Sequence, residues 1–190
     1  METGKRVITI YTPDKTYTGT MDVPNETLRS IDIFNSSNIY WKNAAEKSFD
    51  DALLLYNASI ILEGNTKLGE FNKLHIKLSD VIFFHDSLET LGNSKEKMRA
   101  ANLSMKTKES ASAAHIITHT QGRGFFYITG TFSGLFKSKS KYRYIPLTQT
   151  NVVQVTKSDD KWQKKSIQIE GGFLGLNTKF IESCTFSEKN

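Results

Sequence analysis

The stretch Arg6-Val-Ile-Thr-Ile-Tyr-Thr12 decides the fold class, because almost every residue in it is β-branched or aromatic. Side chains that alternate in this way are typical of a strand whose two faces meet different surroundings. Pro13-Asp14-Lys15 then supplies a turn, and residues 16–23 alternate in the same manner. The two segments therefore predict an antiparallel β-hairpin.

The same patterning continues along most of the chain and predicts a mainly all-β protein. Further strands are expected at residues 37–42, 52–62, 74–85, 124–132, 151–155, 166–170 and 173–186. Residues 94–101 differ, because helix formers dominate there and the apolar stripe is thin. We therefore expect residues 87–120 to be a partly helical linker between an N-terminal β unit, residues 1–86, and a C-terminal β unit, residues 121–190. A helix that binds a partner protein is the alternative for this segment.

Short matches between the two halves indicate an internal repeat. They pair Thr18-Gly-Thr-Met21 with Thr129-Gly-Thr-Phe132, Asn38-Ile39 with Asn151-Val152, and Leu54…Asn57…Ile61 with Leu174…Asn177…Ile181. If the chain is duplicated, each half is a small unit of five strands, and a strongly bent barrel is the natural way for such a unit to bury one face. Gly19 and Gly130 fit sharp bends in the strands of such a barrel.

Three segments of the N-terminal half, Val7-Ile-Thr-Ile10, Tyr17-Thr-Gly19 and Arg29-Ser-Ile-Asp32-Ile-Phe-Asn35, resemble a family of small bacterial Sm-like domains of unknown function. In that family a strand with glycine precedes an Arg-x-x-Asp-x-x-Asn segment. The resemblance covers about residues 5–85, implies an SH3-type barrel and brings no activity with it, and the second half lacks the Asp/Asn pair. We accordingly expect two small Sm-like or SH3-type barrels.

Composition and charge restrict the class of protein further. A chain of 190 residues with 38% hydrophobic side chains has enough apolar content for a core. It shows no secretion signal at its start and no apolar run long enough for a membrane span, so a cytoplasmic location is expected. Its one cysteine, Cys184, excludes an internal disulfide and, beside Phe180 and Phe186, is expected to be a small buried side chain.

The net charge of +5 is unevenly distributed. Residues 1–95 carry 10 Lys/Arg and 13 Asp/Glu, a net charge of −3, whereas residues 96–190 carry 15 and 7, a net charge of +8. Such a chain can attract a second copy head to tail, or offer its basic half to a polyanion. Two solvated faces without a partner are the alternative.

No known catalytic or cofactor motif occurs in the chain. The phosphate-binding Gly-x-x-x-x-Gly-Lys-Ser/Thr, the dinucleotide-binding Gly-x-Gly-x-x-Gly and the nucleophile elbow Gly-x-Ser-x-Gly are all missing. His115 and His119 are four residues apart, as in some metal sites, but no Cys or acidic side chain lies close in sequence to complete a ligand set. We therefore predict no catalytic residue, no cofactor and no metal ligand.

The most distinctive charged stretch lies in the basic half. If it is extended, Lys137, Lys139, Lys141 and Arg143 share one side, and Tyr142 and Tyr144 occupy the other. Such cations neutralise phosphates, and aromatic rings stack on bases, so this stretch is the candidate nucleic-acid-binding site. The alternative is an edge strand whose lysines prevent aggregation while its tyrosines pack inward.

These observations favour a non-enzymatic structural or interaction subunit over an enzyme. We expect it to self-associate through its β-rich units or to bind another protein. Contact between unlike halves is heterologous and produces a ring or a filament. A nucleic-acid-binding Sm-like module is the alternative function.

Overall fold

The computed structural model describes residues 4–24, 28–36, 52–62, 65–87, 112–119, 124–132 and 144–187. Within these residues the protein is mainly β, as the sequence predicts, with one short α-helix and three 3-10 helices. The strand expected at residues 37–42, the helix formers at residues 94–101 and the basic stretch from 137 to 143 lie outside the described residues.

The N-terminal unit is an antiparallel meander whose last strand returns to its first. It consists of β1 (Gly4–Tyr11), β2 (Lys15–Val23), α1 (Ser30–Phe34), β3 (Ala52–Leu62), β4 (Lys67–Lys77), the 3-10 helix η1 (Leu78–Asp80) and β5 (Phe83–Asp86). β1 and β2 pair from Gly4↔Val23 to Tyr11↔Thr16, which confirms the predicted hairpin. β3 pairs with β2, β4 with β3, and β5 with the remaining side of β1.

The C-terminal unit repeats this plan. It consists of β6 (Ser112–Thr118), β7 (Gly124–Phe132), β8 (Tyr144–Ser158), β9 (Lys161–Ile167), the 3-10 helix η2 (Glu170–Gly172), β10 (Leu174–Asn177), the 3-10 helix η3 (Thr178–Phe180) and β11 (Ile181–Ser187). β6, β7, β8 and β9 form the meander, β10 pairs with the start of β8, and β11 returns to β6.

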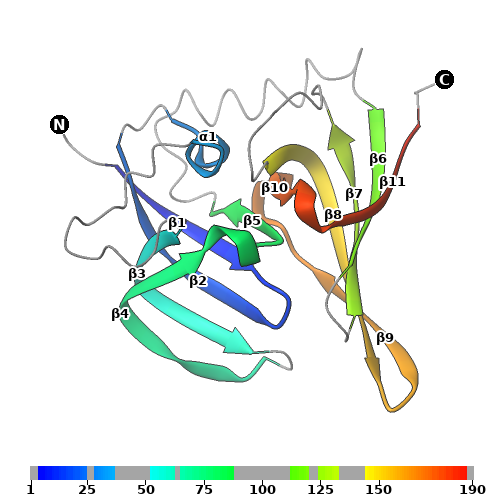
Figure 1. Cartoon of the computed structure of the whole chain (residues 1–190), viewed down its shortest axis with the longest axis horizontal. Coiled ribbons are helices and arrows are strands. Elements are labelled where there is room, and N and C mark those ends of the chain that lie inside the picture. The colour runs from blue at the N-terminus through cyan, green and yellow to red at the C-terminus, as the bar shows by residue number, and fades with distance from the viewer. Residues whose placement is uncertain are drawn as a thin grey trace.

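The two units are parts of one sheet, and Figure 1 shows them side by side. Its strand order is β11-β6-β7-β8-β10-β5-β1-β2-β3-β4, with β9 paired to β8, and every pairing is antiparallel. In the described residues the sheet is open, because β11 and β4 stand at its two ends. The two separate barrels expected from the sequence are thus a single open sheet of two like units.

Several sequence-based boundaries differ from the structure. Residues 173–186 form β10, η3 and β11 instead of one strand, and only the first two residues of 166–170 belong to β9. β6 lies inside residues 87–120, so this range is not wholly linker. The short apolar strand was not predicted, because the residues before Ser112 are mostly polar. Residues 74–85 form the end of β4, η1 and the start of β5 instead of one strand. Alternation alone did not reveal this corner, because Leu78, Val81 and Ile82 are buried on both sides of the turn.

The core consists of two clusters that meet at β5. The first lies between α1 and strands β1–β5 and includes Ile8, Leu55 and Phe84, whereas the second lies in the C-terminal unit and includes Ile128 and Leu176. Phe83 belongs to the second cluster although it is a neighbour of Phe84. Successive side chains of a strand point to opposite faces, so β5 supplies one ring to each core.

The strand registers show the same irregularity in both units. Each has a bulge at a glycine: the β2–β3 register shifts beside Gly19, and the β7–β8 register shifts beside Gly130. A Cβ atom at either glycine would come within 3.1 Å of a backbone oxygen of the neighbouring strand, Tyr56 O or Thr148 O. Of the three repeat matches seen in the sequence, the one at these glycines therefore joins equivalent positions.

The other two sequence matches are not supported in the same way. Asn57 lies in β3 and Asn177 in β10, and β10 is the counterpart of the end of β4, so these residues are not equivalent. Asn38 lies outside the described residues. The structural counterpart of Asn57 is Gln149, since both have positive φ, 47° and 52°, at the bulge.

Candidate functional site: the strand edges and the junction between the units

The junction between the units is the pairing of β5 with β10. Gly175 lies opposite Phe84 and Leu176 opposite Phe83. The chain continues the contact beyond the strands, since the Asn177 N–H donates to the Ile82 carbonyl at 2.8 Å and the Asn177 Nδ2 donates to the Val81 carbonyl at 2.9 Å. Asn177 is fully buried, so its amide satisfies polar groups that water does not reach.

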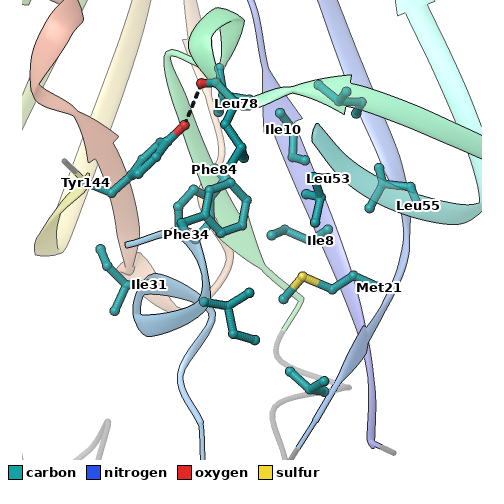
Figure 2. Packing of buried hydrophobic residues seen from close by; sticks show 14 of the residues in the cluster. Ile8, Ile10, Met21, Ile31, Phe34, Leu53, Leu55, Leu78, Phe84 and Tyr144 are labelled. Carbon is teal, nitrogen blue, oxygen red and sulfur yellow. Dashed lines mark hydrogen bonds between the residues drawn. The ribbon is translucent and has the colours of Figure 1, made fainter. Parts of the chain in front are cut away.

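Gly175 lets Phe84 cross this junction. A Cβ atom at position 175 would lie 2.4 Å from two atoms of the Phe84 ring. That ring is stacked on Phe34 of α1, with centroids 3.8 Å apart (Figure 2). Because Phe84 is held from both sides, the small residue in β10 and the large one in β5 form a matched pair.

Tyr144, the first residue of β8, ties the C-terminal unit to the N-terminal core. Its hydroxyl donates to the Leu78 carbonyl at 2.8 Å (Figure 2), and its ring packs edge-on against Phe34 at 5.0 Å. The Asn35 side chain acts as a strand partner for its backbone: Nδ2 donates to the Tyr144 carbonyl at 2.9 Å, and Oδ1 accepts from the Tyr144 N–H at 2.8 Å. Tyr144 is 1% exposed and so offers no face to a base.

The other residues of the candidate nucleic-acid site, Lys137, Lys139, Lys141, Tyr142 and Arg143, lie outside the described residues. The structure thus places Tyr144 alone of the six, and it places that ring in the core.

The segment that carries the Sm-like resemblance makes structural contacts. Arg29 donates to Asp32 from Nε at 2.8 Å and from Nη2 at 2.6 Å. These bonds hold the pKa of Asp32 below its ordinary value, and both side chains are partly exposed. Asn35, the last residue of the segment, holds Tyr144, so the segment positions α1 across the two units.

The two histidines whose spacing is that of some metal sites, His115 and His119, have other partners. His115 Nδ1 is hydrogen-bonded to the Tyr127 hydroxyl at 2.8 Å, and the His119 ring lies 6.2 Å from that of Phe180. In the described part of the chain, no group of three or more His, Cys, Asp or Glu side chains is arranged to hold a metal ion.

Two other buried groups have shifted pKa values. Burial lowers the pKa of His85 below 6.5, and burial raises the pKa of Tyr11 to about 12.

The two end strands of the sheet, β4 and β11, expose apolar side chains. Leu68 and Phe71 on β4 are 57% and 39% exposed, and Phe186 on β11 is 37% exposed. Cys184 on β11 is exposed as well, which corrects the expectation that it is buried. The apolar neighbours Phe180 and Phe186 predicted burial of Cys184, and this prediction was wrong because β11 is paired on one side only in the described residues.

A cleft between the units is lined by cationic side chains. It runs beside the β1–β2 turn, and its lining includes Lys15 of β2 and Lys157, Lys164 and Lys165 of the β8–β9 hairpin. Lys15 is paired with Asp14 at 2.6 Å, and Lys165 donates to Asn65 at 2.7 Å. His75 and Lys77 at the end of β4 line a continuation of this cleft.

A comparison of the chain with protein-family models, with curated proteins and with solved structures found no match in any of the three. Among the described residues, no helix has both the length and the apolar character that a membrane crossing requires.

Proposed function

We propose that the protein is a structural or interaction subunit, not an enzyme, that self-associates head to tail through its β units. The observation that carries this proposal is the open sheet, whose two ends are unlike strands, β4 and β11. A free strand edge presents backbone donors and acceptors that another chain can pair with. Since the ends differ, their union is heterologous and builds a ring or a filament.

We further infer that the two units are duplicated Sm-like or SH3-type units. Support comes from the common strand order, β4-β3-β2-β1-β5 in one unit and β9/β10-β8-β7-β6-β11 in the other. The glycine bulges at equivalent positions of β2 and β7 support it as well.

Self-association is tested by multi-angle light scattering of the full chain across a series of protein and salt concentrations. We expect oligomers at low ionic strength that become smaller as salt rises, because the halves of opposite charge attract and salt screens them. A strict monomer at low salt and high protein concentration would contradict the proposal.

Matched variants locate the surface that associates. Phe71→Asp on β4 should lower the oligomer mass, because a charge on an end strand opposes edge pairing. Tyr127→Asp is the control, since Tyr127 is 36% exposed on β7, a strand that is paired on both sides. Equal loss of oligomers in the two variants would mean that the end strands do not form the contact.

The lysine-lined cleft favours one second candidate, a module that binds nucleic acid. Lys15, Lys157, Lys164 and Lys165 approach a common space, and clustered cations of this kind neutralise phosphates. The test is a gel shift at low salt with single-stranded RNA, comparing the wild type with Lys164→Glu/Lys165→Glu and with charge reversal of the basic stretch, residues 137–143. Loss of the shift only in the first variant would assign binding to the cleft, and no shift of the wild type would exclude this candidate.

A further inference from the structure

We propose that copies of this chain join by antiparallel pairing of the end of β4 in one copy with β11 in the next, with His75 opposite Cys184 and Ile76 opposite Ser183. This contact would repeat, between chains, the β10–β5 junction that joins the units within each chain. The inference rests on the proposed self-association and names the strands and the register that carry it.

The first step is that the end of β4 and β10 are equivalent strands. β4 pairs with β3 at Ala52↔Lys77 and Leu55↔Leu74, and β10 pairs with β8 at Tyr144↔Asn177 and Leu147↔Leu174. Ala52 and Tyr144 are each the first residue of their strand. The four residues of β10 thus correspond in order to Leu74–Lys77.

The second step is that β5 and β11 are equivalent. Both follow a 3-10 helix, η1 or η3, and both return to the first strand of their unit. The β1–β5 register pairs Ile10 with Phe84, and the β6–β11 register pairs Ile116 with Cys184.

The bulge glycines show independently that Ile10 and Ile116 are equivalent residues. Ile8 lies opposite Gly19 and Ala114 opposite Gly130, and these are the two bulge glycines. Counting two residues along each strand from Ile8 and Ala114 leads to Ile10 and Ile116. Phe84 and Cys184 therefore occupy the same place in the two units.

The third step transfers the junction. Within the chain, β10 pairs with β5 at Gly175↔Phe84. The equivalent residues on the ends of the sheet are His75 and Cys184, and in the described residues β4 pairs only with β3 and β11 only with β6. Repetition of the junction between copies would satisfy both ends with one geometry that the chain already contains.

In the pair between copies, the large and the small side chain lie on the opposite strands to those that carry them in the junction. In the junction the small residue, Gly175, lies on β10 and the ring, Phe84, on β5. Between copies the ring, His75, would lie on β4 and the small residue, Cys184, on β11. Each pair combines one ring with one smaller side chain. Cys184 has the Cβ that Gly175 lacks, so the two contacts share the backbone pairing and not the crossing of the ring.

Charge also matches at the next position. Asn177 and Ile82 follow Leu176↔Phe83 in the register, and the Asn177 N–H donates to the Ile82 carbonyl. Their counterparts are Lys77 and Glu182, both exposed in the single chain. Opposite charges that face each other across an antiparallel pair stabilise it, so these side chains favour this register over a shifted one.

The test uses the native Cys184, which is the only cysteine of the chain. His75→Cys places a second thiol on β4, and directly opposite residues of antiparallel strands have Cα atoms about 4.5–5.5 Å apart, within the reach of a disulfide. After oxidation of the full chain with oxidised glutathione, we expect a ladder of covalent oligomers on a non-reducing gel and a 75–184 disulfide in peptide mass spectra. Glu70→Cys is the matched control, because it lies on the same strand five residues out of register.

A second measurement does not depend on cysteine chemistry. Lys77→Glu and Glu182→Lys should each weaken association by about three- to tenfold, because an attractive pair becomes a repulsive one, and the double variant should recover most of the loss.

The outcomes separate the two proposals. Oligomers in light scattering without the 75–184 disulfide, and without recovery in the double variant, would overturn this junction and leave self-association standing. A monomer under all conditions would overturn both.

Discussion

Replacement of Tyr144 by Phe tests the hydroxyl contact that ties the C-terminal unit to η1. The variant loses the 2.8 Å bond to the Leu78 carbonyl and keeps the ring. That carbonyl retains a second donor, the Val81 N–H at 3.3 Å, so it is not left wholly unsatisfied. The expected loss in the free energy of unfolding is therefore about 1–1.5 kcal/mol, at the lower end of the range for a buried acceptor.

For a chain of this size a loss of 1 kcal/mol lowers Tm by about 2–4 °C, which puts the shift for Tyr144→Phe at roughly 2–6 °C. Tyr127→Phe is the control, because its hydroxyl is bonded to His115 at 2.8 Å but the side chain is 36% exposed. Water replaces that bond, so we expect a change within about 0.5 kcal/mol. Urea titration followed by circular dichroism measures both values.

Tyr144→Ala separates the ring from the hydroxyl. The ring packs against Phe34 and lies 5.6 Å from Phe84, and its removal should cost about 3–5 kcal/mol, as for other buried aromatic side chains. If Tyr144→Phe costs no more than Tyr127→Phe, the Tyr144 hydroxyl does not hold the units together. If Tyr144→Ala is also mild, the ring is not part of the core.

Two further predictions concern the junction and the pH dependence of stability. Gly175→Ala should lower the free energy of unfolding by about 1–3 kcal/mol, because its Cβ would overlap the Phe84 ring; Gly69→Ala, whose Cβ would meet only Phe71 at 3.5 Å, should be near neutral in the same urea titration. Burial holds the pKa of His85 below 6.5, so the unfolded chain takes up a proton that the folded chain resists, and stability should fall as the pH drops below 6.5. The His85→Asn variant should show a weaker dependence between pH 7.5 and 5.5, and an unchanged slope would contradict this assignment.

Local patterns in the sequence predicted the elements whose contacts are local. The β1–β2 hairpin follows from alternation and a turn within eighteen residues, and β3 was predicted with its observed bounds. The likeness of Gly19 and Gly130 was visible as well, because a close backbone approach admits one residue type at both places. By contrast, α1 has five residues, too few for a helical period to be recognised.

The candidate site depends on contacts between distant residues, which the sequence does not indicate. The sequence suggested association between unlike halves, through their charge, but it did not identify the edges. Phe84 and Gly175 are 91 residues apart, and neither has a neighbour in sequence that indicates the other. Tyr144 had the same alternation whether it faced a base or the core, and its burial together with its contacts to Leu78 and Phe34 decides between them.

The sequence by itself thus determined that this protein is mainly β, that its halves carry opposite net charge and that a glycine motif recurs in them. These properties depend on residue types and spacings that act over a few positions. Only the tertiary structure decided that the units share one open sheet, that β5 divides its two rings between two cores and that Cys184 is exposed. The physical reason is that strand pairing between distant segments is selected by the fit of whole surfaces, and no local period records that fit.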